Sequence, residues 1–504
     1  MGVLLVLLVL MPAVTTLACV VVPRQIAATL TVLTGIAAFA FAVALIAPAT
    51  NRTLSALHYL RADALSVVFV LATAFLYMTT AIYAIGYQAA EAATVQAGGE
   101  DRRIFARYSR LFYIGLNAFA WSMLAAPLVN GLALLWIAVE VTTVISALLV
   151  ALDDTEGATE AAWKYVLIAS SGLGIALLAT IFMYYAGSTV LGESYDLAFD
   201  ELLRGAASMP HVPVQLAFVL AVVGFGTKVG LFPVHTWLPD AHAEAPTPVS
   251  ALLSGSLLAV SFYAILRFYQ ISIIPLGTRF PQLVLLVFGV ASLLLAALYL
   301  LEQRDIKRLL AYSSVEHMGI LTIGVSFGVP LALAGVLLHV LAHAAAKGNA
   351  FMGAGVMVRK YGTKELHRIR DALSRLPWSA PMFLMAVFAL AAMPPFGLFR
   401  SEFQILSGGL ADHRNAAAVT LVCLVTVAFA GLTAATTWML FAPARLEGPG
   451  AATAAVLERG EPSTWMVVPV VIGVAALLLL GLAPPGDLID LLTRAANDLA
   501  GVSR

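Results

Sequence analysis

The chain has 504 residues, of which 61% are hydrophobic and only 11% are charged. Soluble domains carry roughly 45–50% apolar and 25% charged residues, so this composition excludes a soluble globular protein and predicts a polytopic membrane protein. Basic and acidic residues balance at 28 each, which leaves no basic surplus for binding nucleic acid. Cys19 and Cys423 stand alone in separate apolar segments, so we expect no metal cluster, redox centre or other cofactor held by this chain.

Apolar runs of about 18 residues or more predict an all-α integral membrane fold with about fourteen transmembrane helices. The first run, 2–22, lacks the basic flank of a signal peptide and is interpreted as a span. Lysine and arginine are more frequent in the odd-numbered loops, which predicts a plasma (inner) membrane protein with both termini outside the cytoplasm. The predicted spans begin near residues 2, 26, 62, 108, 128, 160, 211, 246, 280, 305, 329, 379, 414 and 464.

Prolines interrupt two of the predicted spans, at Pro233 in span 7 and at Pro394-Pro395 in span 12. These spans are five apart. Because five is an odd number, two five-helix repeats would have opposite orientations in the membrane, and their discontinuous helices would meet near the midplane. The predicted units are residues 1–107 with spans 1–3, 108–271 with spans 4–8, 272–441 with spans 9–13, and 442–504 with a hydrophilic loop and span 14.

Spans 5 and 7 each contain an ionisable residue close to the middle of the membrane, Glu140 and Lys228. Such residues are costly in a bilayer and typically mark ion or proton paths. We expect the two to form a pair that stays charged when close, and from which the lysine can release its proton when they separate. A permanent ion pair that fixes two helices is the alternative. His235 follows Lys228 in the predicted break of span 7.

Span 11 carries His339, His343 and Lys347 at intervals of four, so the three lie on one helical face and could pass protons along through water. Two histidines at this spacing also suit a metal ion, but Lys347 would repel one. Glu316 and His317 in span 10 could supply this row.

Two further residues have a functional and a simpler interpretation. Glu402 follows the break of span 12 and is either the last protonatable group before an exit or the partner of Arg400. Lys164 lies just inside span 6, where it either supports the buried pair or extends its ammonium group to the membrane surface.

The stretch 228–267, with its Trp237, His242, Tyr263 and Arg267, resembles the proton-conducting antiporter-like membrane subunits. That family includes subunits of respiratory complex I, of hydrogenases and of multisubunit Na⁺/H⁺ antiporters. The stretches 313–319, 361–364 and 394–399 look most like component F of hydrogenase-4-type complexes. We expect no long amphipathic helix after span 14 of the kind that the largest antiporter-like subunit of complex I has, so this chain is not expected to be that type of subunit.

The resemblance implies a coupled pair at Glu140 and Lys228, support from Lys164 and an outer half-channel at Glu402. Many family members have a lysine or histidine in span 8 where this chain has the uncharged stretch 257–261. Either His317, His339 or His343 replaces that group, or the proton path is impaired. The residues expected to translocate protons are Glu140, Lys164, Lys228, His235, His317, His339, His343, Lys347 and Glu402.

The resulting hypothesis is a subunit of a respiratory-type hydrogenase or complex I-like assembly that moves protons or Na⁺ across the lipid bilayer. Its expected partners are other membrane subunits and a peripheral redox arm of hydrogenase and iron–sulfur subunits, and no catalysis is expected from this chain alone. The alternatives are a subunit of a redox-independent cation/proton antiporter and the membrane partner of an inorganic-carbon uptake system.

Overall fold

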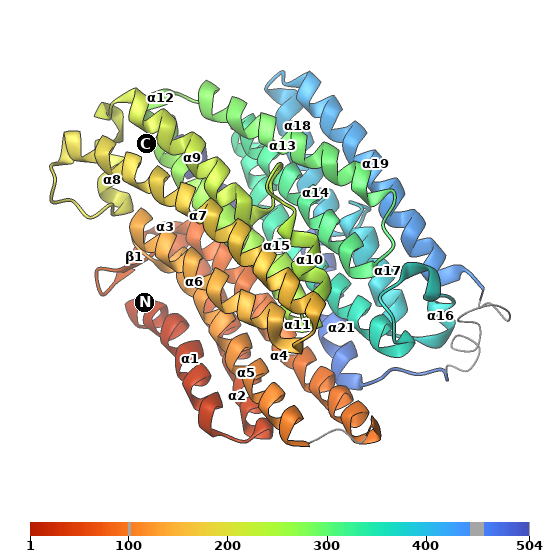
Figure 1. Cartoon of the computed structure of the whole chain (residues 1–504). Coiled ribbons are helices and arrows are strands. Elements are labelled where there is room, and N and C mark those ends of the chain that lie inside the picture. Colours follow the sequence, from red (N-terminus) through yellow and green to blue (C-terminus); the bar gives the residue numbers. More distant parts are fainter. Residues whose placement is uncertain (99–101, 444–457, 503–504) are drawn as a thin grey trace.

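The structure is a computed structural model that describes residues 1–98, 102–443 and 458–502. It is nearly all helical, and its one sheet among these residues is a small antiparallel hairpin of β1 (Leu54–Ala56) and β2 (Leu60–Ala62). Figure 1 shows long helices packed side by side, from α1 at one edge of the molecule to α19 at the other.

The N-terminal part consists of α1 (Gly2–Val21), α2 (Arg24–Ala44), α3 (Ile46–Asn51), α4 (Ala64–Gly98) and α5 (Arg102–Ala125). The next part contains α6 (Leu132–Val150), α7 (Glu156–Leu191), α8 (Phe199–Gly205), α9 (His211–Val229), α10 (Trp237–Glu244), α11 (Thr247–Leu252) and α12 (Leu258–Leu276). The remainder contains α13 (Arg279–Leu300), α14 (Ile306–Phe327), α15 (Pro330–Tyr361), α16 (Ala372–Arg375), α17 (Ser379–Leu390), α18 (Gly397–Ala411), α19 (Asn415–Phe441), α21 (Thr464–Leu482) and α22 (Gly486–Ala500). Short 3₁₀ turns are η1 (Ala126–Leu128), η2 (Ala151–Asp153), η3 (Ala206–Ser208) and η5 (Leu366–Arg368).

Twelve helical segments among the described residues are long and apolar enough to cross a membrane. They match twelve of the predicted spans. The other two predicted spans are α14, which carries several charged residues, and the broken pair of α17 and α18. The count of fourteen therefore stays a prediction.

The two predicted helix breaks are present. Helix α9 ends at Val229, Gly230 has a positive φ of 84°, and the chain passes Pro233 before α10 begins at Trp237. In span 12, α17 ends at Leu390 and α18 begins at Gly397, with Pro394 and Pro395 between them. Each break removes helical hydrogen bonds and leaves backbone groups inside the bundle, which a membrane protein tolerates where protein or water satisfies them.

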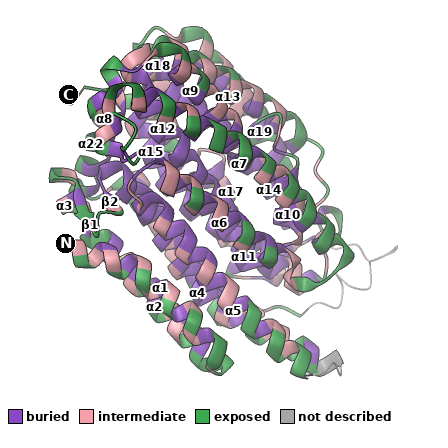
Figure 2. Ribbon diagram, turned by 60° about the vertical axis from the view of Figure 1, so that its left-hand side comes forward, coloured by how far each residue is buried: buried purple, intermediate pink, exposed green. Residues whose placement is uncertain are grey.

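The centre of the bundle is formed by α4, α12 and α15, whose residues are almost all buried, as Figure 2 shows for α4 and α15. Helices α7 and α9 approach closely because Gly224 lies against the backbone of Ala176 and Gly172 lies against Thr227. These glycines bring Lys228, in the last turn of α9, against the inner face of the bundle.

Two local features differ from the sequence-based expectation. Span 8 contains a π-helical segment, η4 (Leu253–Leu257), between α11 and α12. The C-terminal unit contains a short amphipathic helix, α22, after α21; it buries Leu488, Leu491 and Leu492 against the bundle. The hydrophilic loop predicted in this unit falls largely on residues 444–457, outside the described residues. The division into repeats stays a prediction.

Candidate functional site

Lys228 is fully buried, and its ammonium group is bound by α6. It donates hydrogen bonds to the carbonyl oxygen of Val139 at 2.8 Å, to Thr142 Oγ1 at 2.7 Å and to Thr143 Oγ1. These three acceptors match the three donors of an ammonium group. The expected ion pair with Glu140 is therefore not formed in this structure, because a carbonyl and two hydroxyl groups on the same helix satisfy the lysine instead.

Glu140 lies one residue beyond the carbonyl that binds Lys228. Its Oε1 accepts a hydrogen bond of 2.9 Å from Ser170 Oγ on α7, and its Oε2 is buried without a hydrogen-bond partner among the described residues. A buried carboxylate oxygen with no partner is costly. It is also free to take a proton or a water molecule, as a group on a proton path must.

Lys347 on α15 has a similar environment. It is fully buried and donates to the carbonyl oxygen of Leu310 at 2.8 Å and to Ser313 Oγ, both on α14. Glu316, one turn further along α14, is also buried, and its Oε2 has no hydrogen-bond partner in the described part of the chain.

Three buried histidines form a cluster between α14 and α15. His317 Nδ1 lies 3.1 Å from His339 Nε2, and His339 Nδ1 lies 3.0 Å from Ser401 Oγ on α18. The ring of His343 is 5.1 Å from that of His317, centroid to centroid, but neither of its nitrogens has a hydrogen-bond partner among the residues that the structure describes. The predicted link between spans 10 and 11 is present, whereas His343 joins it by ring contact alone.

The hydrogen bonds define a direction within this cluster. Ser401 Oγ donates its single proton to the carbonyl oxygen of Leu398 at 2.8 Å, so it accepts from His339 Nδ1–H. Neutral His339 then accepts at Nε2 from His317 Nδ1–H. His317 Nε2 is consequently an acceptor, and it is buried without a partner in the described ranges. A proton added there can pass through both imidazoles toward Ser401.

Glu402 on α18 lies at the end of this row. Its ligand oxygen and one nitrogen each of His317 and His339 lie within 4.8 Å of one another. Among the described residues this group, rather than His339 with His343, has its ligand atoms close enough together to share a metal ion. Glu402 Oε1 is buried without a described partner, and no ion pair within 4 Å joins Glu402 to Arg400 among the described ion pairs. The alternative of a static pair with Arg400 is therefore not what the structure has.

Two predicted residues lie apart from these groups. Lys164 is about half exposed and forms ion pairs with Glu160 at 2.6 Å and Asp240 at 3.2 Å, so it does not contact Glu140 or Lys228. His235 is buried in the break after α9, where its ring stacks on that of Phe232, and its Nδ1 has no partner among the described residues.

The sequence interpretation missed several hydroxyl groups that contribute to the site. Span 8 lacks a basic residue, but its π-helical segment places Ser254 Oγ 2.7 Å from Ser314 Oγ, next to the serine that binds Lys347. Ser256 in the same segment is 2.7 Å from Thr73 Oγ1 on α4. The signal was present as the serines Ser250, Ser254, Ser256 and Ser261 of one apolar span, at intervals of two to five residues.

A second buried charge cluster joins α12 to the start of α4. Arg267 donates to Asp63 Oδ1 at 2.6 Å, and Arg61 donates to Asp63 Oδ2 at 2.6 Å. Burial raises the pKa of Asp63, but the guanidinium groups of Arg267 and Arg61 outweigh it and hold this pKa well below its usual range. All three residues are buried, Asp63 pairs with both arginines, and Arg61 also pairs with Asp200 at 2.8 Å, so the cluster is structural.

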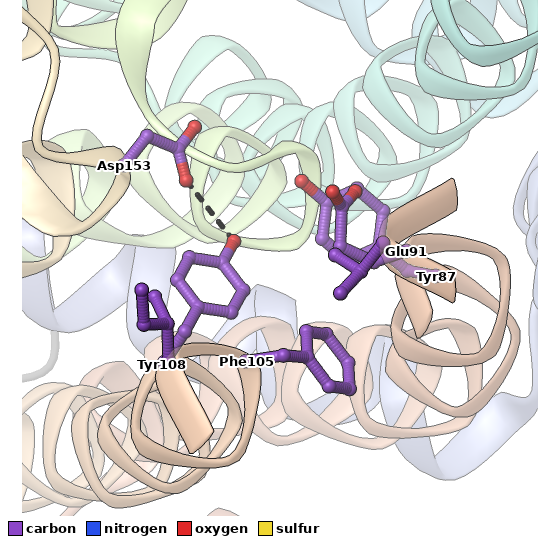
Figure 3. Close-up of a pocket in the computed structure, with 7 residues that line it drawn as sticks. Tyr87, Glu91, Phe105, Tyr108 and Asp153 are labelled. Atoms are coloured by element: carbon purple, nitrogen blue, oxygen red, sulfur yellow. Dashed lines mark hydrogen bonds between the residues drawn. The ribbon is translucent and has the colours of Figure 1, made fainter. Parts of the chain in front are cut away.

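A surface pocket of about 290 Å³ lies between α4, α5 and η2 (Figure 3). Tyr108 donates to Asp153 Oδ1 at 3.0 Å across it, and Tyr87, Glu91 and Phe105 also line it. None of the predicted site residues lines this pocket, so this concave surface and the buried ionisable groups are separate features.

Buried lysines, histidines and carboxylates inside a helical bundle with two broken helices are typical of membrane proteins that move ions. Comparison with known proteins agrees. Residues 129–428 match the family described as NADH:quinone oxidoreductase/Mrp antiporter, transmembrane, and the chain belongs to this family. It is an antiporter-like membrane subunit of the kind found in respiratory-type complexes.

Curated relatives include a hydrogenase-4 component F homolog from Methylacidiphilum infernorum, 37% identical over 72% of this chain and 75% of the relative. Hydrogenase-4 component B of Escherichia coli is 30% identical over 68% of this chain and 50% of that protein. A protein of Rhizobium meliloti described as part of a probable K⁺/H⁺ antiporter is 30% identical over 74% of this chain and 36% of the relative.

Solved structures have the same fold. A chain of the Mrp complex from Dietzia has a TM-score of 0.82 at 20% identity, covering 99% of this chain and 98% of its own. A chain of respiratory complex I from Thermus thermophilus has a TM-score of 0.79 at 24% identity, and the match covers 98% of this chain and 99% of that chain. The resemblance inferred from the sequence motifs is thus confirmed.

Proposed function

We propose that this subunit moves protons, or Na⁺, across the plasma membrane through its buried ionisable groups, driven by redox chemistry in a peripheral arm of the same complex. The observation that carries the proposal is the hydrogen-bonded row from His317 through His339 to Ser401, which ends beside Glu402. Lys228 and Lys347, both fully buried, would load and release the ion.

The coupling step is assigned to Glu140. Protonation of Glu140, or movement of charge in a neighbouring subunit, changes the potential at the Val139 carbonyl and at the two threonines that bind Lys228. A less favourable electrostatic potential lowers the stability of the protonated form of a fully buried lysine relative to its neutral form, so the lysine releases its proton. The same logic applies to Lys347 with Glu316, from which the proton would pass to the histidine row.

The test is the Lys228→Met substitution, which keeps the length of the side chain and removes its charge. Proton uptake by inverted membrane vesicles should be abolished while the complex still assembles. Lys164→Met is the matched control, because Lys164 is half exposed and pairs with Glu160 and Asp240 rather than with the buried row, and it should retain most transport. Normal uptake by the Lys228→Met complex would reject the proposal.

The redox arm is proposed from the relatives named as components of hydrogenase-4. Mass spectrometry of the complex purified through a tag on this chain should find hydrogenase and iron–sulfur subunits. The relative described as part of a K⁺/H⁺ antiporter favours a second candidate, a redox-independent cation/proton antiporter. Recovery of small membrane subunits alone would select that candidate.

A further inference from the structure

A cavity of about 350 Å³ lies where the turn between α1 and α2 meets α5. Its walls are mostly apolar, and Arg24 and Arg110 are the only charged residues among the described residues that line it. Arg24 lies over the ring of Phe105, 5.4 Å from its centroid. None of the described ion pairs within 4 Å involves either arginine. The cavity therefore presents two guanidinium groups without a counter-ion in the described part of the chain.

The position of the cavity is at a membrane boundary. Only two residues separate α1 from α2, both apolar spans, and Arg24 is the first charged residue after α1. Arg110 is on α5, whose side chains point toward its N-terminus, and that end lies beside the α1 and α2 turn in Figure 1. Both guanidinium groups are thus directed to the headgroup level of the bilayer.

We infer that this cavity binds the headgroup of an anionic phospholipid, with the phosphate between Arg24 and Arg110. Guanidinium groups match phosphate oxygens in geometry as well as charge. The apolar residues that line the cavity beside the two arginines, among them Val22, Ala27 and Phe105, would contact the first part of the acyl chains. Basic pockets between transmembrane helices at this level are typical lipid-headgroup sites. A soluble phosphate ion could make the same contacts with the arginines, but it has no acyl chain to contact the apolar wall and should therefore bind more weakly.

The experiment measures phosphatidylglycerol bound to the purified full-length chain in detergent by native mass spectrometry. Arg24→Gln and Arg110→Gln should each weaken retention about fivefold, and the double variant should lose the tightly bound lipid. Arg107→Gln is the matched control, since Arg107 is on the same helix but lines a different pocket, toward α6. The double substitution of both arginines by lysine should restore part of the binding, because charge remains.

Each other outcome would overturn the inference. Equal retention by the double glutamine variant would show that the arginines bind no lipid, and an equal loss in Arg107→Gln would show general attraction to a basic surface. Binding of inorganic phosphate as strong as that of phosphatidylglycerol would assign the cavity to a soluble anion. Lipid bound to the isolated chain but absent from the purified complex would assign the cavity to a neighbouring protein of that complex. Thermal unfolding of each variant checks that the fold is intact.

Discussion

Lys228 and Lys347 are bound in the same way by two different helices. Each ammonium group donates to a backbone carbonyl and to the hydroxyl three residues further along the same helix: Val139 and Thr142 for Lys228, Leu310 and Ser313 for Lys347. In both cases that hydroxyl also donates to the same carbonyl. In the predicted numbering of spans, the accepting helices α6 and α14 are spans 5 and 10, which is the spacing that the predicted repeats require. The helices that carry the two lysines, α9 and α15, do not have this spacing. The two repeats are therefore equivalent in the sites that accept the ammonium groups, but not in the positions of the lysines.

The shared binding mode predicts that the hydroxyl groups stabilise the buried lysines. Thr142→Val and Ser313→Ala each remove an acceptor from a fully buried ammonium group, so each should cost about 1–3 kcal/mol of stability. Thermal unfolding of the purified chain measures this loss. Thr426→Val is the control, since Thr426 is exposed and its hydroxyl bonds the Val422 carbonyl of its own helix. Losses no larger than that of the control would mean that these lysines are not held by the hydroxyl groups.

The direction of the histidine row gives a second prediction. Ser401→Ala removes the acceptor of His339 Nδ1–H, so the tautomer that receives a proton from His317 is no longer fixed. We expect proton uptake to fall by about tenfold or more, because a relay depends on a pre-positioned donor and acceptor. The stability should change by only about 1 kcal/mol.

Ser401→Thr keeps the hydroxyl and should restore transport. If Ser401→Ala transports at the normal rate, protons do not pass through His339 Nδ1.

A third prediction concerns Asp63. Asp63→Asn leaves buried Arg267 without its carboxylate, and breaking a buried ion pair in this way costs about 3–5 kcal/mol. The exposed pair of Asp412 and Arg414 offers a matched control, because Asp412→Asn should cost less than about 1 kcal/mol. Thermal unfolding at neutral pH compares the two.

The same carboxylate sets a pH dependence. The pKa of Asp63 is lowered by folding, so its contribution is complete above the unfolded pKa of about 4 and is lost as the pH falls toward the folded pKa. Wild-type protein should lose stability in acid below about pH 4 from this group, and Asp63→Asn should show a smaller loss over that range. An identical acid profile for both proteins would contradict the assignment.

The features that could be predicted from the sequence follow from local rules. Pro233 and Pro394-Pro395 lie in the breaks that follow α9 and α17, as expected for a residue that lacks a backbone donor. Proline alone is not sufficient for a break, because α1, α12 and α21 each continue through one. The long apolar runs identify spans by length. Helix α22 was missed because it is short and amphipathic, with charged residues that resemble a polar tail.

The partners of the buried groups could not be predicted in this way. Glu140 and Lys228 look complementary as charges, yet the lysine binds a carbonyl and two threonines that cluster on one turn of α6. Hydroxyl side chains in an apolar span give little signal until the facing helix is known. The contact of His339 with Ser401 likewise depends on how α18 packs after its break.

The close contact between α21 and the break of span 12 gives the last prediction. A Cβ atom at Gly481 would collide with the carbonyl oxygen of Pro395 and come within 2.7 Å of the Phe396 carbonyl carbon. Backbone atoms cannot rotate away, so Gly481→Ala should displace the start of α18 at a cost of about 1–3 kcal/mol. Because α18 carries Ser401 and Glu402, we expect proton uptake to fall together with thermal stability. Gly174→Ala is the control: Gly174 has open space around it on α7, so alanine should leave transport unchanged and stability equal or higher. Full transport by Gly481→Ala would mean that the position of α18 does not limit the proton path.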